Sequence, residues 1–139
     1  MAYIKKEFTF PSTSGLAEIH AASYFPENGE VKAVIQAAHG MAEHLERYEK
    51  FADALTDLGI AFYISDHLGH GKSVTSDNEL GYFGEEDGWK YFVEDCYRLT
   101  GIAKAENPGK PFFFFGHSMG SFVARAYTLK YAHELNGAI

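Results

Sequence analysis

The sequence predicts an α/β fold, in which helices cover a mostly parallel sheet. Short apolar runs with the length of buried strands alternate with stretches whose apolar residues recur at helical spacing. The last apolar run leads through a glycine–serine turn into a helical stretch. At 139 residues the chain has the size of one domain, which we take to span residues 1–139.

The chain begins with two expected strands. Lys5–Phe10 alternates weakly between apolar and polar residues, and Leu16–Phe25 does so more clearly. Pro11–Gly15 lies between them and is rich in turn-forming residues. The pattern predicts a hairpin-like pair.

A strand and a helix are expected next. Val31–Ala38 is a nearly continuous apolar run, typical of a buried strand. A helix is predicted from Glu43 onward, and Gly59 follows as its C-terminal stop. The apolar residues at helical spacing in this stretch are Leu45, Tyr48, Phe51, Ala52, Leu55 and Leu58.

The second half repeats this order. Ile60–Ile64 is a further expected strand, and a polar, glycine-rich loop runs over residues 67–87. A helix follows, and the strand Pro111–Phe115 leads into the last helix. The apolar face predicted for the first of these helices comprises Trp89, Phe92, Val93, Cys96, Leu99 and Ile102.

Charge and composition exclude several classes of partner. The formal net charge of −7 disfavours nucleic acids and anionic membrane surfaces, which bind clustered Lys and Arg. Cys96 is the only cysteine, so no intrachain disulfide is possible, and we expect it to fill core space. The sequence contains no apolar run of 18 residues, the length that would predict a transmembrane segment, and we expect a cytoplasmic protein.

The segment Gly116–Gly120 reads Gly-His-Ser-Met-Gly between a buried strand and a helix. This is the context of a nucleophile elbow, whose serine sits on a tight, strained turn. The pattern predicts Ser118 as a nucleophile, with Gly116 and Gly120 required by the geometry of the turn. The alternative is a glycine–serine turn that only reverses the chain.

A second pattern supports this interpretation. In acyl-transfer enzymes with such an elbow, the residue after the nucleophile and a loop after the third strand supply two oxyanion-binding N–H groups. Here these are the backbone N–H groups of Met119 and, in the His-Gly-Met sequence that starts at His39, of Met41. The alternative is that Gly40 serves only a strand-to-helix turn.

The residues 39–44 (His-Gly-Met-Ala-Glu-His), 66–73 (Asp-His-Leu-Gly-His-Gly-Lys-Ser) and 116–120 together resemble the α/β-hydrolase superfamily. Within it, the chain is similar to the monoacylglycerol lipase and lysophospholipase-like branch, and Arg47-Tyr48 fits that branch. The resemblance implies a serine hydrolase of lipid or other carboxylic esters, without a metal or organic cofactor. Ser121 departs from the second glycine that this branch often has, and we expect its small side chain to be tolerated.

The histidines have structural interpretations. His67 and His70 are expected to stabilise their loop through backbone hydrogen bonds, and the same holds for His39 and His44, without a ligand set typical of a metal site. We expect His117 to be a structural residue of the elbow. His20 carries no functional signal in the sequence.

The resemblance also implies that part of the catalytic machinery lies outside these residues. In α/β-hydrolases an acid and a histidine follow the serine in the chain. After Ser118 the sequence contains only one histidine, His133, and one acid, Glu134. Both lie on the same predicted helix as the elbow, and their order in the chain is the reverse of the family's. The chain is therefore interpreted as the N-terminal part of one α/β-hydrolase domain, without later strands, cap, catalytic acid or histidine, and inactive alone.

This interpretation has a consequence for partners. The strand Pro111–Phe115 would form a sheet edge, with a sixth strand only starting near Leu135–Ile139. An open edge of four phenylalanines promotes pairing with another chain. We expect the C-terminal half of the same fold, or a second copy, to cover it.

Two other functions remain open from the sequence. One is an interaction module that keeps the hydrolase fold without its chemistry, and the other is a related serine aminopeptidase or thioesterase. The substrate's acyl chain and head group are not indicated by these residues.

Overall fold

The computed structural model describes residues 3–41, 43–73 and 88–139. Within these residues the strands form one sheet in the order β1 (Tyr3–Pro11), β2 (Glu18–Pro26), β4 (Ile60–Ser65), β3 (Ala33–Ala38), β5 (Phe112–Gly116) and β6 (Gly137–Ala138). β1, β2 and β4 pair antiparallel, while β4, β3, β5 and β6 run parallel. The predicted α/β class and the initial hairpin are confirmed.

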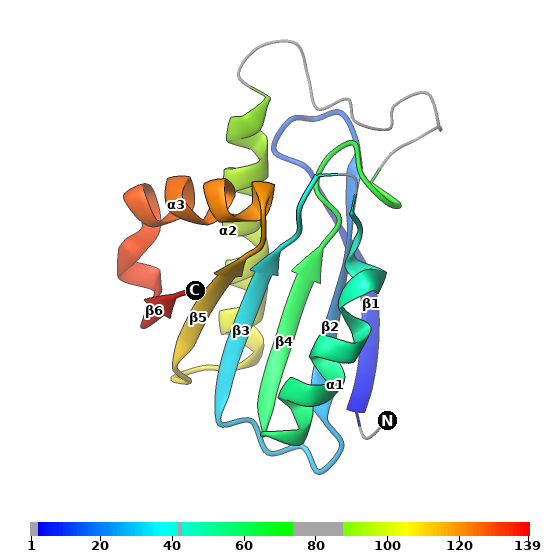
Figure 1. Ribbon diagram of the computed structural model, residues 1–139, viewed down its shortest axis with the longest axis vertical. Helices are drawn as coiled ribbons and strands as arrows, with labels where there is room; N and C mark the ends of the chain where they lie inside the picture. The colour runs from blue at the N-terminus through cyan, green and yellow to red at the C-terminus, as the bar shows by residue number, and fades with distance from the viewer. Residues whose placement is uncertain (1–2, 42, 74–87) are drawn as a thin grey trace.

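Helices cover both faces of this sheet (Figure 1). On one face, α1 (Glu49–Asp57) follows a 3₁₀ turn, η1 (Leu45–Tyr48). On the other face lie α2 (Trp89–Glu106) and α3 (Met119–Tyr131), which ends in a second 3₁₀ turn, η3 (Ala132–Glu134). Two separate clusters of buried side chains fill the space on the two faces.

The phenylalanine strand β5 serves both clusters because its side chains alternate between the faces. Phe112 and Phe114 are buried under α2 and α3. Phe113 and Phe115 pack on the α1 side, where the rings of Phe115 and Phe51 are 5.2 Å apart. The four aromatic residues therefore anchor the turn that follows them from both faces.

A buried polar network connects the central strand to both helices of one face. The side chain of Gln36 on β3 donates to the carbonyl oxygen of Cys96 at 2.8 Å and accepts from Thr100 at 2.6 Å. The hydroxyl of Thr100 also lies 2.7 Å from that of Tyr127 on α3. These bonds satisfy the polar groups inside an otherwise apolar core.

Several expected boundaries were wrong. The helix expected from Glu43 begins as the 3₁₀ turn η1 and becomes α-helical only at Glu49. Trp89, expected on the buried helical face, is 53% exposed at the first residue of α2. His133 and Glu134 lie in η3, beyond the end of α3. Residues 74–87 of the expected loop lie outside the described residues.

The expectation that β5 is an open edge was also wrong. β6 pairs with it in register Phe113↔Gly137 and Phe114↔Ala138. The amide of Asn136 donates to the carbonyl oxygen of Phe112 at 2.7 Å, and its side chain accepts from the Phe112 N–H at 2.8 Å. A two-residue strand and one asparagine thus provide hydrogen-bond partners for backbone groups of β5, which was expected to be an open edge.

No helix among the described residues is long and apolar enough to cross a membrane.

Candidate functional site

The turn between β5 and α3 holds the candidate nucleophile in an unusual backbone conformation. Ser118 has φ 57° and ψ −121°, the only positive φ at a non-glycine position among the described residues. Side chains rarely adopt this region, which costs about 1–3 kcal/mol and occurs mainly at functional sites. The serine is exposed at the surface and sits at the N-cap of α3. We call residues 116–120 the elbow.

Two glycines allow the elbow to cross close to neighbouring backbone. A Cβ atom on Gly116 would lie 2.3 Å from the carbonyl oxygen of Gly120. A Cβ atom on Gly120 would lie 2.0 Å from the carbonyl oxygen of Ala38, at the end of β3. Neither contact is sterically possible, so both positions require glycine.

The loop after β3 lies directly beside the elbow. β3 and β5 are parallel neighbours with Ala38 opposite Gly116, and the N–H of His117 donates to the carbonyl oxygen of Ala38 at 3.2 Å. A Cβ atom on Gly40 would lie 3.2 Å from the Cβ of Ser118. The structure therefore brings together the two segments that the sequence singled out.

The two candidate oxyanion donors belong to peptides whose carbonyl groups are already held. The carbonyl of Ser118, in the peptide before Met119, accepts from the backbone N–H of Ser121 at 2.8 Å and from its hydroxyl at 2.6 Å. The carbonyl of Gly40, in the peptide before Met41, accepts from the ring of His39 at 2.7 Å. In a trans peptide the N–H points away from the C=O, and no acceptor for either N–H occurs among the described residues.

Ser121, the departure from the usual glycine, fits this turn. Its hydroxyl donates to the carbonyl oxygen of Ser118 at 2.6 Å. This bond is compatible with the tolerance expected from the sequence, which stays a prediction.

The loop after β4 is organised around a buried carboxylate. Asp66 accepts from the N–H of Leu45 at 2.7 Å and from that of Lys72 at 2.9 Å, and its other contact is the ring of His20 at 3.0 Å. A side chain on Gly71 would collide with this carboxylate. Asp66 therefore fixes the loop onto β2 and onto the entry to η1.

Three histidines close the same end of the sheet as structural groups. The Nε2 of His39 accepts from the backbone N–H of His67 at 2.9 Å, and the Nε2 of His67 lies 3.1 Å from the carbonyl oxygen of His39. The Nδ1 of His70 lies 3.1 Å from the carbonyl oxygen of Leu68. The predicted loop-stabilising role of these histidines is confirmed.

Burial keeps this histidine pair neutral. Desolvation lowers the pKa of His39 to about 4, and it lowers the pKa of His67 well below its ordinary value. Desolvation also raises the pKa of Cys96, which lies in the core as expected. These groups are not poised for proton transfer at neutral pH.

The described residues supply no proton acceptor for the candidate nucleophile. No hydrogen bond from any described histidine or carboxylate reaches the hydroxyl of Ser118. His117 lies next to it in the chain, but its Nδ1 faces Glu43 at 3.3 Å. Among the same residues no group of three or more His, Cys, Asp or Glu is placed to hold a metal ion.

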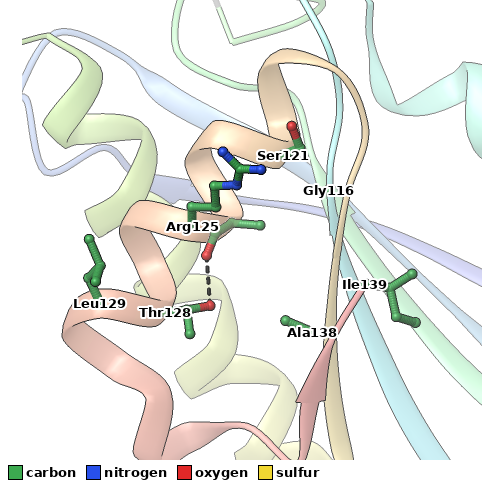
Figure 2. A pocket seen from close by; sticks show the side chains of 8 residues that line it. Gly116, Ser121, Arg125, Thr128, Leu129, Ala138 and Ile139 are labelled. Atoms are coloured by element: carbon green, nitrogen blue, oxygen red, sulfur yellow. Dashed lines mark hydrogen bonds between the residues drawn. The ribbon is translucent and has the colours of Figure 1, made fainter.

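A groove of about 640 Å³ opens beside the elbow, between α3 and β6. Figure 2 shows Gly116 and Ser121 at the end of the groove near the elbow, with Arg125, Leu129 and Ile139 along its sides. Leu129 is 91% exposed and Ile139 67% exposed. The groove is mostly apolar, and residues of β5, β6 and α3 line it.

Two connections were missed from the sequence. His20 carries no motif, yet it is buried and bonds to Asp66 and Glu7. Glu43 is part of the motif that starts at His39, but it was assigned no role, although its carboxylate joins three segments of the site. The position of Glu43 three residues after Gly40 was the available signal, since that spacing allows a side chain to reach back to a backbone N–H.

The loop after β3 that contains Gly40 and Met41 is called the glycine loop below. A mostly parallel sheet, an exposed serine at a strained strand-to-helix turn and the adjacent glycine loop define an α/β-hydrolase. Residues 29–139 match the family described as serine aminopeptidase, S33, and the chain belongs to this family.

Named relatives and solved structures agree with this assignment. The chain is 31% identical over 135 residues to a monoacylglycerol lipase of Mycolicibacterium smegmatis, covering 97% of this chain and 45% of that protein. It is 35% identical over 101 residues to human monoglyceride lipase, covering 73% and 31%. A thermostable carboxyl esterase from Bacillus coagulans aligns with a TM-score of 0.90 and 32% identity, covering 99% of this chain and 43% of that one. The chain thus spans less than half the length of each.

Proposed function

We propose that Ser118 is the nucleophile of a carboxylic-ester hydrolase that acts on monoacylglycerols or related lipid esters. The observation that carries the proposal is an exposed serine with φ 57° beside two backbone N–H groups that have no acceptor among the described residues. Strain at an exposed polar residue has no value for stability, so its persistence favours a catalytic role.

The chemistry follows from this arrangement. The Ser118 hydroxyl attacks the ester carbonyl, and negative charge develops on the carbonyl oxygen. The N–H groups of Met41 and Met119 donate hydrogen bonds to that oxygen and stabilise its charge. Loss of one such donor typically lowers kcat about 10²–10³-fold. Collapse of the tetrahedral species releases the alcohol and leaves an acyl-enzyme, which water hydrolyses.

A proton acceptor must complete the site. Because the described residues supply none, we propose that a histidine, oriented by an acid, comes from residues beyond this sequence. Without that base an enzyme of this type loses about 10⁶-fold in kcat, so residues 1–139 alone are expected to be inactive.

The same missing residues suit the groove between α3 and β6. Its exposed apolar side chains, Leu129 at 91% and Ile139 at 67%, resemble a surface that further chain covers. We propose that the C-terminal half of the same fold packs here, in place of the contact with β5 expected from the sequence, and that a second copy is the alternative occupant.

The substrate class rests on the relatives. Those compared above are named monoacylglycerol lipase, monoglyceride lipase and carboxyl esterase, whereas the family description names an aminopeptidase. Ester hydrolysis is therefore the first proposal and amide hydrolysis at a peptide N-terminus the second. A lysophospholipid is a further candidate ester.

The test uses the complete polypeptide that contains these residues. It should hydrolyse a monoacylglycerol and react with a fluorophosphonate at Ser118, and Ser118→Ala should abolish both. Ser14→Ala, which changes a serine of the β1–β2 turn, is the matched control and should keep both. Cleavage of an aminoacyl anilide without ester hydrolysis would favour the peptidase, and no reaction with either substrate or probe would reject the hydrolase proposal.

A further inference from the structure

Glu43 is the one side chain that contacts the glycine loop, the elbow and η1 together within the described residues. Its Oε1 accepts from the N–H of Gly40 at 2.6 Å and from the hydroxyl of Tyr48 at 3.0 Å. The same oxygen lies 3.3 Å from the Nδ1 of His117, the residue before the candidate nucleophile.

Glu43 holds Gly40 from both sides. Its carboxylate accepts the N–H of Gly40, and its own backbone N–H donates to the carbonyl oxygen of Gly40 at 3.3 Å. The first bond removes the Gly40 N–H from competition as an oxyanion donor. The second acts on the peptide that also contains the Met41 N–H, so it helps to fix the direction of that N–H.

The space around Gly40 leaves little freedom for an alternative arrangement. A Cβ atom on Gly40 would lie 2.9 Å from the Oε1 of Glu43 and 3.3 Å from the carbonyl oxygen of His117. The loop is therefore confined between the Glu43 carboxylate and the elbow backbone. Because oxyanion stabilisation depends on donors placed before the reaction, a carboxylate that fixes this loop controls its efficiency.

We propose that Glu43 is a positioning residue for the oxyanion donor: it fixes the Gly40–Met41 peptide against the elbow so that the Met41 N–H faces the reacting carbonyl. The inference rests on the proposed esterase function. Glu43 does not touch substrate and accepts no proton from Ser118.

The ionisation of Glu43 fits this role. Burial raises the pKa of the carboxyl, but the bonds from Gly40, Tyr48 and His117 outweigh that effect, and the net pKa is lowered. Its side chain is only 17% exposed, so the bonded arrangement is shielded from water. At neutral pH all three donors meet an ionised acceptor.

Two conservative variants separate the charge of the Glu43 carboxylate from the position of its acceptor oxygen, because the two explanations predict opposite orders of kcat. A fixed negative charge near a developing oxyanion opposes its formation, so the value of Glu43 must lie in the bonds that it accepts. Glu43→Gln keeps the length and the acceptor oxygen, and kcat is expected to stay within about 3-fold. Glu43→Asp keeps the charge but withdraws the oxygen by one methylene, and kcat is expected to fall about 10-fold or more.

Glu49 provides a matched control. Like Glu43 it has three hydrogen-bond partners, here the side chains of Tyr3, Lys5 and Tyr24. These lie on β1 and β2, on the other side of the sheet order from β5 and the elbow (Figure 1). Both glutamates have a lowered pKa. Glu49→Ala therefore removes a comparable cluster without touching the site.

The experiment measures kcat and KM of the complete polypeptide on an ester, together with its fluorophosphonate labelling rate and melting temperature. Glu43→Ala should lower kcat about 10- to 100-fold with KM within about 3-fold, because a displaced oxyanion donor weakens only the transition state. Glu49→Ala should lower the melting temperature while kcat stays within about 2-fold.

Three results would overturn the inference. The first is an equal loss of kcat in Glu43→Ala and Glu49→Ala, and the second is a changed KM with unchanged kcat in Glu43→Ala. The third is a higher kcat in Glu43→Asp than in Glu43→Gln. If Glu43→Ala does not fold, the Gln and Asp variants decide the question. A wild-type protein that shows neither labelling nor hydrolysis would reject the esterase proposal and this inference together. A labelled wild type with unaffected Glu43 variants would reject this inference alone.

Discussion

Two loop regions at the same end of the sheet differ in whether their polar groups have protein partners. In the loop after β4, buried Asp66, His67 and Ser73 are all bonded to protein partners. At the elbow and the glycine loop beside it, the N–H groups of Met41 and Met119 lack a protein acceptor among the described residues. The first loop fixes the fold, and the second leaves strain and free donors where a ligand can use them. Substitutions in the two regions should therefore have effects of different kinds.

The largest effect is expected from Gly120→Ala. The new Cβ atom would lie 2.0 Å from the carbonyl oxygen of Ala38, so the elbow and β3 must separate. We expect a loss of about 4 kcal/mol or more in the free energy of unfolding, measured with urea. Gly101→Ala, in α2 with open space around it, is the control and should stabilise by up to about 1 kcal/mol. Equal effects at both positions would show that the close crossing is not rigid.

The second effect concerns the saturated loop. Asp66→Ala leaves the buried N–H of Leu45 and the part-buried N–H of Lys72 without this acceptor, and we expect a loss of about 3 kcal/mol by urea unfolding. The exposed Asp57→Ala, at the end of α1, should stay within about 0.5 kcal/mol of wild type. A small change at Asp66 would mean that the loop holds without this carboxylate.

The third effect is a pH dependence of stability. Because burial depresses the pKa of His39 from 6.5 to about 4, the unfolded chain binds this proton more readily. The stability from neutral His39 is complete above pH 6.5 and declines as pH falls toward 4, by about 3 kcal/mol. His67 acts in the same direction.

Urea unfolding between pH 7 and 5 measures this slope. His39→Asn should flatten it, while His133→Asn, on the exposed η3, should leave it unchanged. Identical slopes in the wild type and His39→Asn would contradict the assignment of His39 as a buried neutral group.

The smallest effect should come from the serine itself. Ser118→Gly removes the cost of φ 57°, offset in part by the greater freedom of glycine when unfolded, and should stabilise by about 1 kcal/mol. Ser118→Ala keeps the unfavourable conformation and should not stabilise. If both variants unfold at the same urea concentration, the elbow stores no strain.

The sequence predicted the fold class, the hairpin and the elbow because each rests on local patterns, such as the phenylalanine run before Gly116. It missed the 3₁₀ turn before α1, where the N–H of Leu45 is held by Asp66, 21 residues away, because a tertiary bond decides the local geometry. It also left β5 as an open edge, because a two-residue strand such as β6 has no periodicity to detect.

The candidate site divides in the same way. Ser118, Gly116 and Gly120 stand together in one motif, and the loop of Met41 follows a recognisable strand. The roles of Glu43 and His20 depend on partners in other elements, including His117 at 74 positions from Glu43. Spacing within a single sequence does not reveal such pairs.

The most direct test of Ser118 as the nucleophile is a crystal structure of the complete polypeptide after reaction with a fluorophosphonate. We expect phosphorus bonded to the Ser118 oxygen, with the phosphonyl oxygen about 2.7–3.1 Å from the backbone nitrogens of both Met41 and Met119. An adduct on another residue, or a phosphonyl oxygen turned away from these two amides, would contradict it.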